Sequence, residues 1–224
     1  MNALGESPEM YLKTICELTT DQPIVPISDL AQRMGISPVS ATEMVHRMEA
    51  LELAGHLHYK GVFLTDHGRR RGLQVLRSHR LWERFLVDEL GLPWAEVHEM
   101  ACRLEHAGDP QLIEALAGKL GYPSTCPHGN IIPDPDDDPP EEALRPLAEL
   151  DAGESGTLSC IRPENTTILR QLGEHGLRPG VQLEVQAIEP IDGLRTLQVL
   201  GRIVVIGVQL SHHVYLAARP DGGG

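Results

Sequence analysis

The spacing of apolar positions changes along the chain and divides it into a helical front and a strand-rich back. In the front, apolar residues at helical spacing predict helices over 8–18, 28–34, 37–53, 66–90, from after Pro93 to His106, and 109–120. In the back, short alternating runs predict strands over 156–161, 181–188, 194–200, 203–208 and 213–216, with one helix over 165–175. The pattern therefore predicts an α+β protein whose C-terminal part is a small β-barrel.

The first three helices and the segment after them follow the order of a winged helix-turn-helix. Ser28 is the expected N-cap of the second helix, and Gly35 permits a tight turn after it. Ser37 and Pro38 supply an N-cap and a first-turn proline for the third helix. Residues 56–64 alternate around a Lys-Gly turn, which predicts a hairpin wing. We therefore expect a DNA-binding domain.

The start of the third helix carries small and hydroxylated side chains, which suit close approach to a major groove. Lys60 at the hairpin tip and the arginines at 69–71 are candidates for phosphate contacts. The alternative is an ordinary helical hairpin with a solvated basic cluster. The side chains that we expect to face DNA are Ser37, Pro38, Val39, Ser40, Thr42, Glu43, Arg47 and Lys60.

Candidate metal ligands recur at helical spacing near the middle of the chain. His98, Cys102, Glu105 and His106 follow one another at offsets of four, three and one, which in an α-helix place them on one face. Imidazole, thiolate and carboxylate groups bind first-row transition metals. The alternative is a solvated acidic helix face, but four such residues together favour a metal site.

A second pair of candidate ligands lies on the preceding helix. His79 and Glu83 are separated by four residues and share a helix face, so they can form one centre with His98. Cys102, Glu105 and His106 would then form another centre, which lacks a fourth ligand. Met10 on the first helix is a candidate thioether for that position. Cys126 and His128, in a proline-flanked loop, are interpreted as a structural turn rather than a zinc site.

The net charge of −13 gives no general support for nucleic-acid binding, but it is unevenly distributed. Residues 1–80 carry nine basic and nine acidic side chains, whereas residues 81–150 carry four and fifteen. No apolar run approaches the roughly 18–20 residues that a membrane span needs. The N-terminus lacks a signal-peptide pattern, and the four cysteines are scattered, so we expect a cytoplasmic protein with reduced thiols and no membrane partner.

No nucleophile motif, Gly-rich phosphate loop or catalytic triad is present in the sequence, so we do not expect an enzyme. A metalloenzyme and a metal-storage or adaptor protein remain the competing classes. The segment 133–142 is rich in proline and acidic residues and separates the helical and strand-rich parts. We expect a DNA-binding domain over 1–73, a helical metal-binding and dimerisation domain over 74–140, a linker over 141–153 and a barrel over 154–224.

Four motifs resemble those of one known family. They are the opening helix EMYLKTI over 9–15, HRLWERFL over 79–86, VHEMACRLEH over 97–106 and CPHGNIIP over 126–133. Together they resemble the diphtheria toxin repressor family of iron-dependent regulators, which includes iron-type and manganese-type branches. The resemblance implies an N-terminal winged helix-turn-helix, a helical dimerisation domain and a C-terminal SH3-like (FeoA-like) domain. It implies a homodimeric repressor of metal-ion homeostasis genes that binds palindromic promoter DNA.

The resemblance also implies two metal ions per chain. The primary, activating site would consist of Met10, Cys102, Glu105 and His106. The ancillary site would consist of His79, Glu83 and His98, completed from the C-terminal domain by Glu164, with Gln171 as a weaker candidate. The manganese-type branch has carboxylates where this chain has Met10 and Cys102. A thioether and a thiolate are softer ligands, so Fe(II) is expected, with Mn(II) as the alternative.

Overall fold

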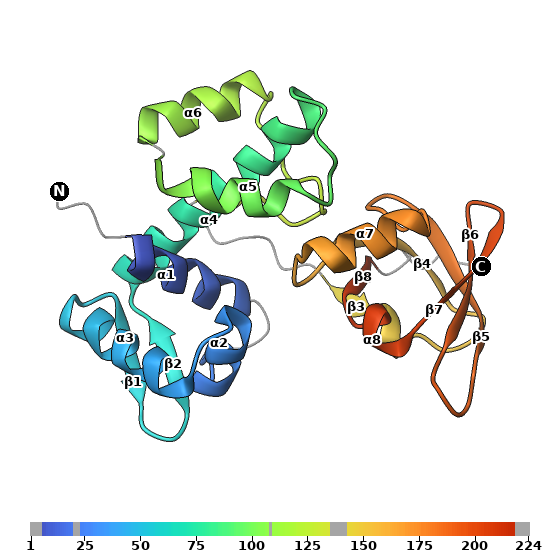
Figure 1. The fold of residues 1–224 in the computed structure, drawn as a ribbon, viewed down its shortest axis with the longest axis horizontal. Helices are drawn as coiled ribbons and strands as arrows, with labels where there is room; N and C mark the ends of the chain where they lie inside the picture. The colour runs from blue at the N-terminus through green and yellow to red at the C-terminus, as the bar shows by residue number, and fades with distance from the viewer. Residues whose placement is uncertain (1–5, 20–22, 108, 135–142, 218–224) are drawn as a thin grey trace. The chain divides into compact units, whose positions relative to one another are not determined.

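The structure is a computed structural model that describes residues 6–19, 23–107, 109–134 and 143–217 (Figure 1). It divides into two compact units, and each is described by itself. The first unit contains Met1–His79, Arg103–Ile113 and Pro133–Pro139, and the second contains Arg80–Cys102, Glu114–Ile132 and Pro140–Gly224. Residues 135–142, which include most of the proline-rich segment, lie outside the described residues. In the described part of the chain, no helix combines the length and apolarity needed to cross a membrane.

The first unit begins with the predicted winged helix-turn-helix (Figure 1). It contains α1 (Glu6–Leu18), α2 (Ile27–Met34) and α3 (Pro38–Ala50), followed by the antiparallel hairpin of β1 (Ala54–Leu57) and β2 (Gly61–Leu64). The helices form because their apolar residues share a face, and these residues meet in one core. Its largest fully buried members are Leu12, Ile15, Leu30, Met48 and Leu53.

Local sequence determines where α2 and α3 begin. The side chain of Ser37 caps α3 by accepting a hydrogen bond of 3.1 Å from the backbone N–H of Ser40, as predicted. The prediction for Ser28 is wrong. The N-cap of α2 is Pro26, and the Ser28 hydroxyl instead donates to the Asp29 carboxylate at 3.0 Å. Gly35 ends α2 with a φ of 66°, a left-handed conformation that glycine adopts without a steric penalty.

The middle of the chain contains α4 (Asp66–Asp88), α5 (Val97–Leu104), the 3-10 helix η1 (Glu105–Ala107) and α6 (Pro110–Lys119). The predicted helix to His106 is therefore too long, because α5 ends at Leu104. Glu105 and His106 lie in a tighter 3-10 turn, where side chains no longer follow the α-helical period. The four candidate ligands therefore do not share one continuous α-helix face: His98 and Cys102 lie on α5, and Glu105 and His106 lie on η1.

The second unit includes a six-stranded antiparallel sheet in the order β3-β8-β4-β5-β6-β7. Leu158, Leu183 and Leu197 are buried in the hydrophobic core that this sheet helps to form. The elements are β3 (Leu144–Pro146), the 3-10 helix η2 (Leu147–Glu149), β4 (Ser155–Ile161), α7 (Thr166–Glu174), β5 (Gln182–Ile188), β6 (Arg195–Val199), β7 (Arg202–Ile206), α8 (Val208–Ser211) and β8 (Val214–Ala217).

The segment 141–153 differs from the linker expected there. Strand β3 pairs with β8, and Leu147 and Leu150 are buried in the core of the β-domain. Because burying two leucines is favourable, residues 144–150 fold as part of the β-domain and do not form a linker to it. The five predicted strands are all present, whereas β3 is too short for an alternating pattern to reveal it.

Candidate metal centres and DNA-binding face

In the first unit, Glu105 lies among cationic and imidazole groups. Its Oε2 is 2.7 Å from Lys13 Nζ and accepts a hydrogen bond from His79 Nδ1. The Glu105 side chain is fully buried, and that of Lys13 is 7% exposed. Burial raises the pKa of Glu105, but His79 and Lys13 lower it more strongly, so its net pKa lies below the usual value. Glu105 is therefore ionised at neutral pH.

His106 in the same turn connects α1 to the start of α4. Its Nδ1 lies 2.8 Å from Glu9 Oε2, and the other Glu9 oxygen accepts a hydrogen bond of 2.6 Å from Arg71. Arg71, which the sequence made a candidate for phosphate contact, thus has a carboxylate partner. Glu9 and Lys13 were missed in the sequence analysis. Their spacing of four residues on one face of α1 was the available indication.

The second carboxylate oxygen of Glu105 and the second imidazole nitrogen of His106 lie close to each other. Nε2 of His106 and Oε1 of Glu105 are 3.3 Å apart. Both atoms are buried and lack a hydrogen-bond partner among the residues that the structure describes. Buried polar atoms are normally paired, and two ligands of one divalent ion lie roughly 3.0–3.4 Å apart. The pair therefore fits a shared divalent metal ion.

The structure places the other two expected primary ligands differently. Met10 follows Glu9 on α1 and is 42% exposed. Cys102 belongs to the second unit, where its Sγ lies 3.9 Å from Nε2 of His98. Glu105 and His106 are thus the members of the expected primary set that the first unit itself brings together.

In the second unit, the structure brings Glu83, His98 and Glu164 together. Nδ1 of His98 is 3.2 Å from Glu83 Oε1 and 3.4 Å from Glu164 Oε2. Their ligand atoms lie within 4.8 Å of one another. His79 precedes Glu83 by one turn of α4. Burial opposes protonation of His98, but hydrogen bonds to Cys102, Glu164 and Glu83 raise its pKa well above the usual value.

The same two carboxylates also face Cys126 and His128. His128 Nδ1 lies 3.4 Å from Glu83 Oε2 and 3.8 Å from Glu164 Oε1, and Cys126 Sγ lies 3.7 Å from Glu164 Oε1. Nε2 of His128 donates to the backbone carbonyl of Trp94 at 2.7 Å. Cys126 and His128 do lie in a turn, but their side chains have carboxylate partners that the sequence did not reveal. These four residues form a second group of potential ligands that shares Glu83 and Glu164 with His98.

Burial and neighbouring charges shift the pKa values of the side chains in this group. Burial, together with the Glu83 and Glu164 carboxylates, raises the pKa of Cys126 to about 11. Burial and Glu83 also tend to raise the pKa of Glu164, but His98 and the positive charges of His128 and Arg80 lower it to about 2. Burial lowers the pKa of His128, yet Glu83 and Cys126 raise it well above its usual value. Without a metal, the protonated imidazoles of His98 and His128 therefore balance the two carboxylates, and the Cys126 thiol stays neutral.

The loop that carries Cys126 and His128 packs tightly on strand β4. Gly129 has a φ of 85°, and a Cβ at this position would overlap the carbonyl oxygen of Ser159. The Asn130 side chain donates to the Ile161 carbonyl at 3.0 Å and also to the Glu164 carboxylate. Glycine and asparagine at these positions therefore hold the loop against the β-domain.

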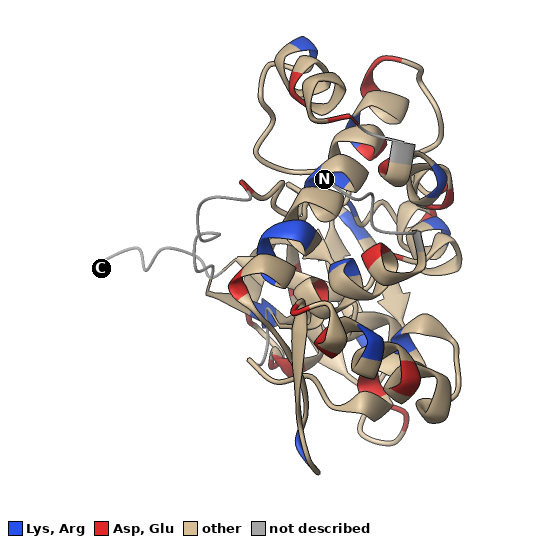
Figure 2. Ribbon diagram, turned by 90° about the vertical axis from the view of Figure 1, so that its left-hand side faces the viewer, with Lys and Arg blue, Asp and Glu red and all other residues tan. Residues whose placement is uncertain are grey.

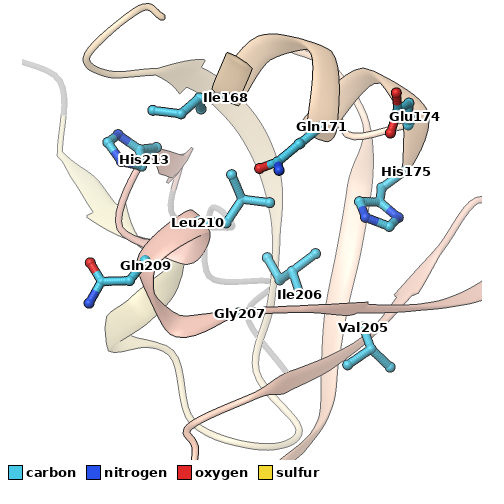
Figure 3. Close-up of a pocket in the computed structure, with 10 residues that line it drawn as sticks. All are labelled: Ile168, Gln171, Glu174, His175, Val205, Ile206, Gly207, Gln209, Leu210 and His213. Atoms are coloured by element: carbon cyan, nitrogen blue, oxygen red, sulfur yellow. The ribbon is translucent and has the colours of Figure 1, made fainter.

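Gln171, the weaker candidate for the ancillary site, lies elsewhere. Its side chain is exposed and lines a cavity of about 480 Å³ formed by α7, β7 and α8 (Figure 3). The apolar side chains of Ile168, Ile206 and Leu210 also line this cavity, as does His213 (Figure 3). Glu164, rather than Gln171, is the residue of the β-domain that the structure places beside His98.

The residues expected to contact DNA lie on the surface of the first unit. Ser37, Pro38, Val39 and Ser40 are all exposed at the start of α3, and Val39 is 69% exposed despite its apolar side chain. Of the other expected contacts, Glu43, Arg47 and Lys60 are exposed and Thr42 is half-buried. Figure 2 shows Lys and Arg interspersed with Asp and Glu along the helices rather than gathered in one continuous stretch. DNA recognition would therefore depend on this local face rather than on overall charge.

Comparison with known families assigns all three parts of the chain. Residues 3–62 match the N-terminal DNA-binding domain of iron-dependent repressors, and residues 65–134 match their metal-binding and dimerisation domain. Residues 145–218 match the FeoA domain. These matches confirm the predicted α+β architecture and identify DNA and a second copy of the chain as partners.

Known proteins similar to this chain agree with that assignment. The iron-dependent repressor IdeR of Mycobacterium tuberculosis is 37% identical over 186 residues, which cover 78% of this chain and 75% of that protein. The diphtheria toxin repressor of Corynebacterium jeikeium is 33% identical over 92% of this chain and 94% of that protein. A solved structure described as a manganese-dependent transcriptional repressor in complex with manganese has a TM-score of 0.85 and 33% identity. The superposed residues cover 95% of this chain and the whole chain of that solved structure.

The metal-binding and dimerisation domain thus contains divalent metal sites, and the function is regulatory rather than enzymatic. The chain belongs to the DtxR/IdeR family of iron-dependent repressors and is a metal-dependent, DNA-binding repressor of transcription.

Proposed function

We propose that Fe(II) is the activating ion and that Met10, Cys102, Glu105 and His106 bind it. The observation that carries this proposal is the buried pair of His106 Nε2 and Glu105 Oε1, 3.3 Å apart and without hydrogen-bond partners in the described residues. The imidazole and carboxylate supply two ligands already held in place by Glu9 and Lys13. Met10 and Cys102 enter the set through the motifs that they share with iron-dependent repressors.

The soft donors support iron over manganese. A thioether and a thiolate favour Fe(II), whereas Mn(II) prefers oxygen ligands. Mn(II) is the second candidate because the chain is similar to a repressor described as manganese-dependent. The preference of the thioether and thiolate for Fe(II) over Mn(II) is small, so the supply of each metal in the cell can decide which ion is bound.

We propose a second ion at the carboxylates Glu83 and Glu164, so that each chain binds two. The ancillary set implied by the family motifs is His79, Glu83, His98 and Glu164. The group of Glu83, Cys126, His128 and Glu164 offers a thiol in addition, and its four ligand atoms lie within 4.8 Å of one another. Because both sets use the same carboxylates, we propose that one ion at a time occupies this region.

In this proposal, metal binding controls the position of α1. Glu9 and Met10 are consecutive residues of α1, and α1 packs in the core of the DNA-binding domain through Leu12 and Ile15. A bound ion would supply a single positive centre shared by α1 and the turn after α5. Glu9 holds His106, and Lys13 holds Glu105, so these residues orient the ligands before binding.

A fixed α1 would set the spacing of the two recognition helices in the homodimer. Each α3 could then meet one half-site of a palindromic promoter. A ligand that binds one conformation more tightly shifts the population toward it, and DNA binding rises accordingly. We propose that the repressor acts in the cytoplasm on genes of metal-ion homeostasis.

The test is a DNA mobility shift on promoters of metal-uptake genes with Fe(II) under anaerobic conditions, with Mn(II), and without metal. Met10→Ala and Cys102→Ala should each reduce metal-dependent DNA affinity by at least about tenfold, as expected for loss of a metal ligand. Met100→Ala, a half-buried methionine of α5 outside the proposed ligand set, is the control. Losses no larger than that of Met100→Ala would contradict the proposed primary site.

The second centre needs a separate measurement. Metal content of the full chain should fall by one equivalent in Glu164→Gln. Comparing Cys126→Ser with His98→Gln then identifies the ligand set, because only the variant that removes a true ligand should weaken binding. Equal metal content in Glu164→Gln and the wild type would contradict a second ion at these carboxylates.

A further inference from the structure

The DNA-binding domain contains another group of metal-ligating side chains, outside both centres described above. His46 and Glu49 lie in the last two turns of α3, and His56 lies in β1 of the wing. One potential ligand atom from each of these three residues lies within 4.8 Å of the other two. The group therefore brings two imidazoles and one carboxylate together from the recognition helix and the wing.

Local sequence accounts for the proximity of these side chains. His46 and Glu49 are three residues apart, so they are neighbours on the surface of α3. The helix ends at Ala50, and the chain turns back into β1 within a few residues. Oε1 of Glu49 accepts a hydrogen bond of 2.8 Å from the backbone N–H of His56. This bond holds the start of the wing against the end of the helix. The rings of His46 and His56 lie edge to face, with centroids 5.6 Å apart.

The carboxylate already contacts one imidazole. Oε2 of Glu49 lies 2.8 Å from His46 Nδ1. Hydrogen bonds from the His46 side chain and the His56 backbone lower the pKa of Glu49, so the carboxylate is charged at neutral pH. A carboxylate and two neutral imidazoles are a donor set suited to borderline divalent ions such as Zn(II) and Co(II).

We propose that His46, Glu49 and His56 form a metal-binding site for a borderline divalent ion, which connects the recognition helix to the wing. Binding replaces the contact between His46 and Glu49 with two bonds to the ion, and any proton on the imidazoles is released to solvent. The side chain of His46 is 59% exposed, which leaves room for water in the remaining coordination positions. In this proposal, a rotation of the exposed His46 ring would bring its nitrogen to coordination distance of the ion.

This site differs from the two centres proposed above in its domain and in the effect of the bound ion. Those centres involve the metal-binding and dimerisation domain, whereas all three residues here lie within the matched DNA-binding domain, residues 3–62. An ion at this position would limit the movement of β1 relative to α3. It would therefore set the angle at which the wing approaches DNA, independently of the activating ion.

The test uses the full chain and Zn(II) as the probe. Metal-free wild type and the double variant His46→Gln/His56→Gln are dialysed against buffered Zn(II), and bound zinc per chain is measured. The double variant should bind one equivalent fewer. His58→Gln is the matched control, because His58 is an exposed histidine of the same hairpin outside the group. Equal zinc content in the wild type and the double variant would overturn the proposal.

A measurement on the wild type covers the case in which the double variant does not fold. Diethylpyrocarbonate modifies accessible imidazoles, and peptide mass spectrometry gives the rate for each histidine. Zn(II) should slow modification of His46 and His56 several-fold relative to His58. The same rates with and without Zn(II) would show that the three residues serve only as a hydrogen-bonded brace between helix and wing.

Discussion

Nε2 of His128 donates a hydrogen bond of 2.7 Å to the backbone carbonyl oxygen of Trp94, and this bond determines which imidazole nitrogen faces the carboxylates. Nδ1 points toward Glu83 and Glu164. Metal-binding histidines are commonly held in this way by a hydrogen bond from the second nitrogen. In the proposed second centre, His128 would therefore be oriented before the metal binds.

Metal binding at Cys126 and His128 should strengthen as pH rises. The pKa of Cys126 is raised to about 11 and that of His128 also lies well above its usual value, so both groups hold protons at neutral pH in the metal-free protein. Binding requires the thiolate and the neutral imidazole and therefore releases protons. The affinity for Zn(II) should rise about tenfold per pH unit for each proton released.

The measurement is a competition titration of Zn(II) between pH 6.5 and 8.5, with chelators of known affinity. Cys126→Ser removes the thiol proton and should reduce the slope by one proton. The same slope in both proteins would mean that Cys126 does not coordinate the ion.

The buried pair of Lys13 and Glu105 should contribute strongly to stability in the metal-free protein. Glu105→Gln removes the carboxylate that lies 2.7 Å from Lys13, and breaking a buried ion pair typically costs about 3–5 kcal/mol. The free energy of unfolding, measured with urea in the presence of a chelator, should fall by this order. In a Lys13→Met background the same change should cost at least about 1 kcal/mol less.

A surface pair supplies the control for that double-mutant cycle. Arg84 and Asp88 are 3.0 Å apart at a spacing of four residues on α4, and both are partly exposed. Their coupling should be roughly 0.3–0.5 kcal/mol. A coupling between Lys13 and Glu105 that is no larger than this would refute a stabilising role for the buried pair.

Two serines provide a test of the helix starts. Ser37→Ala should reduce the free energy of unfolding by about 1 kcal/mol, because its side chain caps α3. Ser28→Ala should change it by less than about 0.5 kcal/mol, since Ser28 is exposed and does not cap α2. Thermal or urea unfolding distinguishes the two. Equal losses would show that Ser28 acts as the cap that its sequence position suggests.

Gly129→Ala should disturb the loop that carries Cys126 and His128. Gly129 has a φ of 85°, and an added Cβ would overlap the Ser159 carbonyl oxygen. Gly121 has a φ of 73°, and no atom of the described residues lies within 4 Å of the corresponding Cβ position. Gly121→Ala should therefore cost only about 1 kcal/mol of left-handed strain, whereas Gly129→Ala should cost more and weaken metal binding. Equal losses in urea unfolding would argue against the close packing on β4.

The sequence predicted those elements whose apolar spacing extends over several turns or a full strand. The order of α1, α2, α3 and the hairpin followed from periodicity and from the turn at Gly35. The end of α5 did not, because nothing in the spacing of residues 98–106 distinguishes an α-helix from one that tightens into a 3-10 turn after Leu104.

The candidate site was predictable where ligands share a helix and not where the fold brings them together. The pair His79 and Glu83 follows from a spacing of four residues. The partners of Cys126 and His128 do not, since Glu83 and Glu164 lie about 40 residues away on either side and meet the loop only through tertiary packing. Contacts of this kind leave no periodic pattern in the sequence.

The separation of Glu83 and Glu164 has a consequence for the folding equilibrium. An ion held by both carboxylates would act as a reversible cross-link around a loop of roughly 80 residues, which the unfolded chain cannot form. At a free metal concentration one hundred times the dissociation constant, such linkage adds about 2.7 kcal/mol to stability. The melting temperature of this repressor would then rise and fall with the metal supply of the cell, and so would its lifetime against proteolysis.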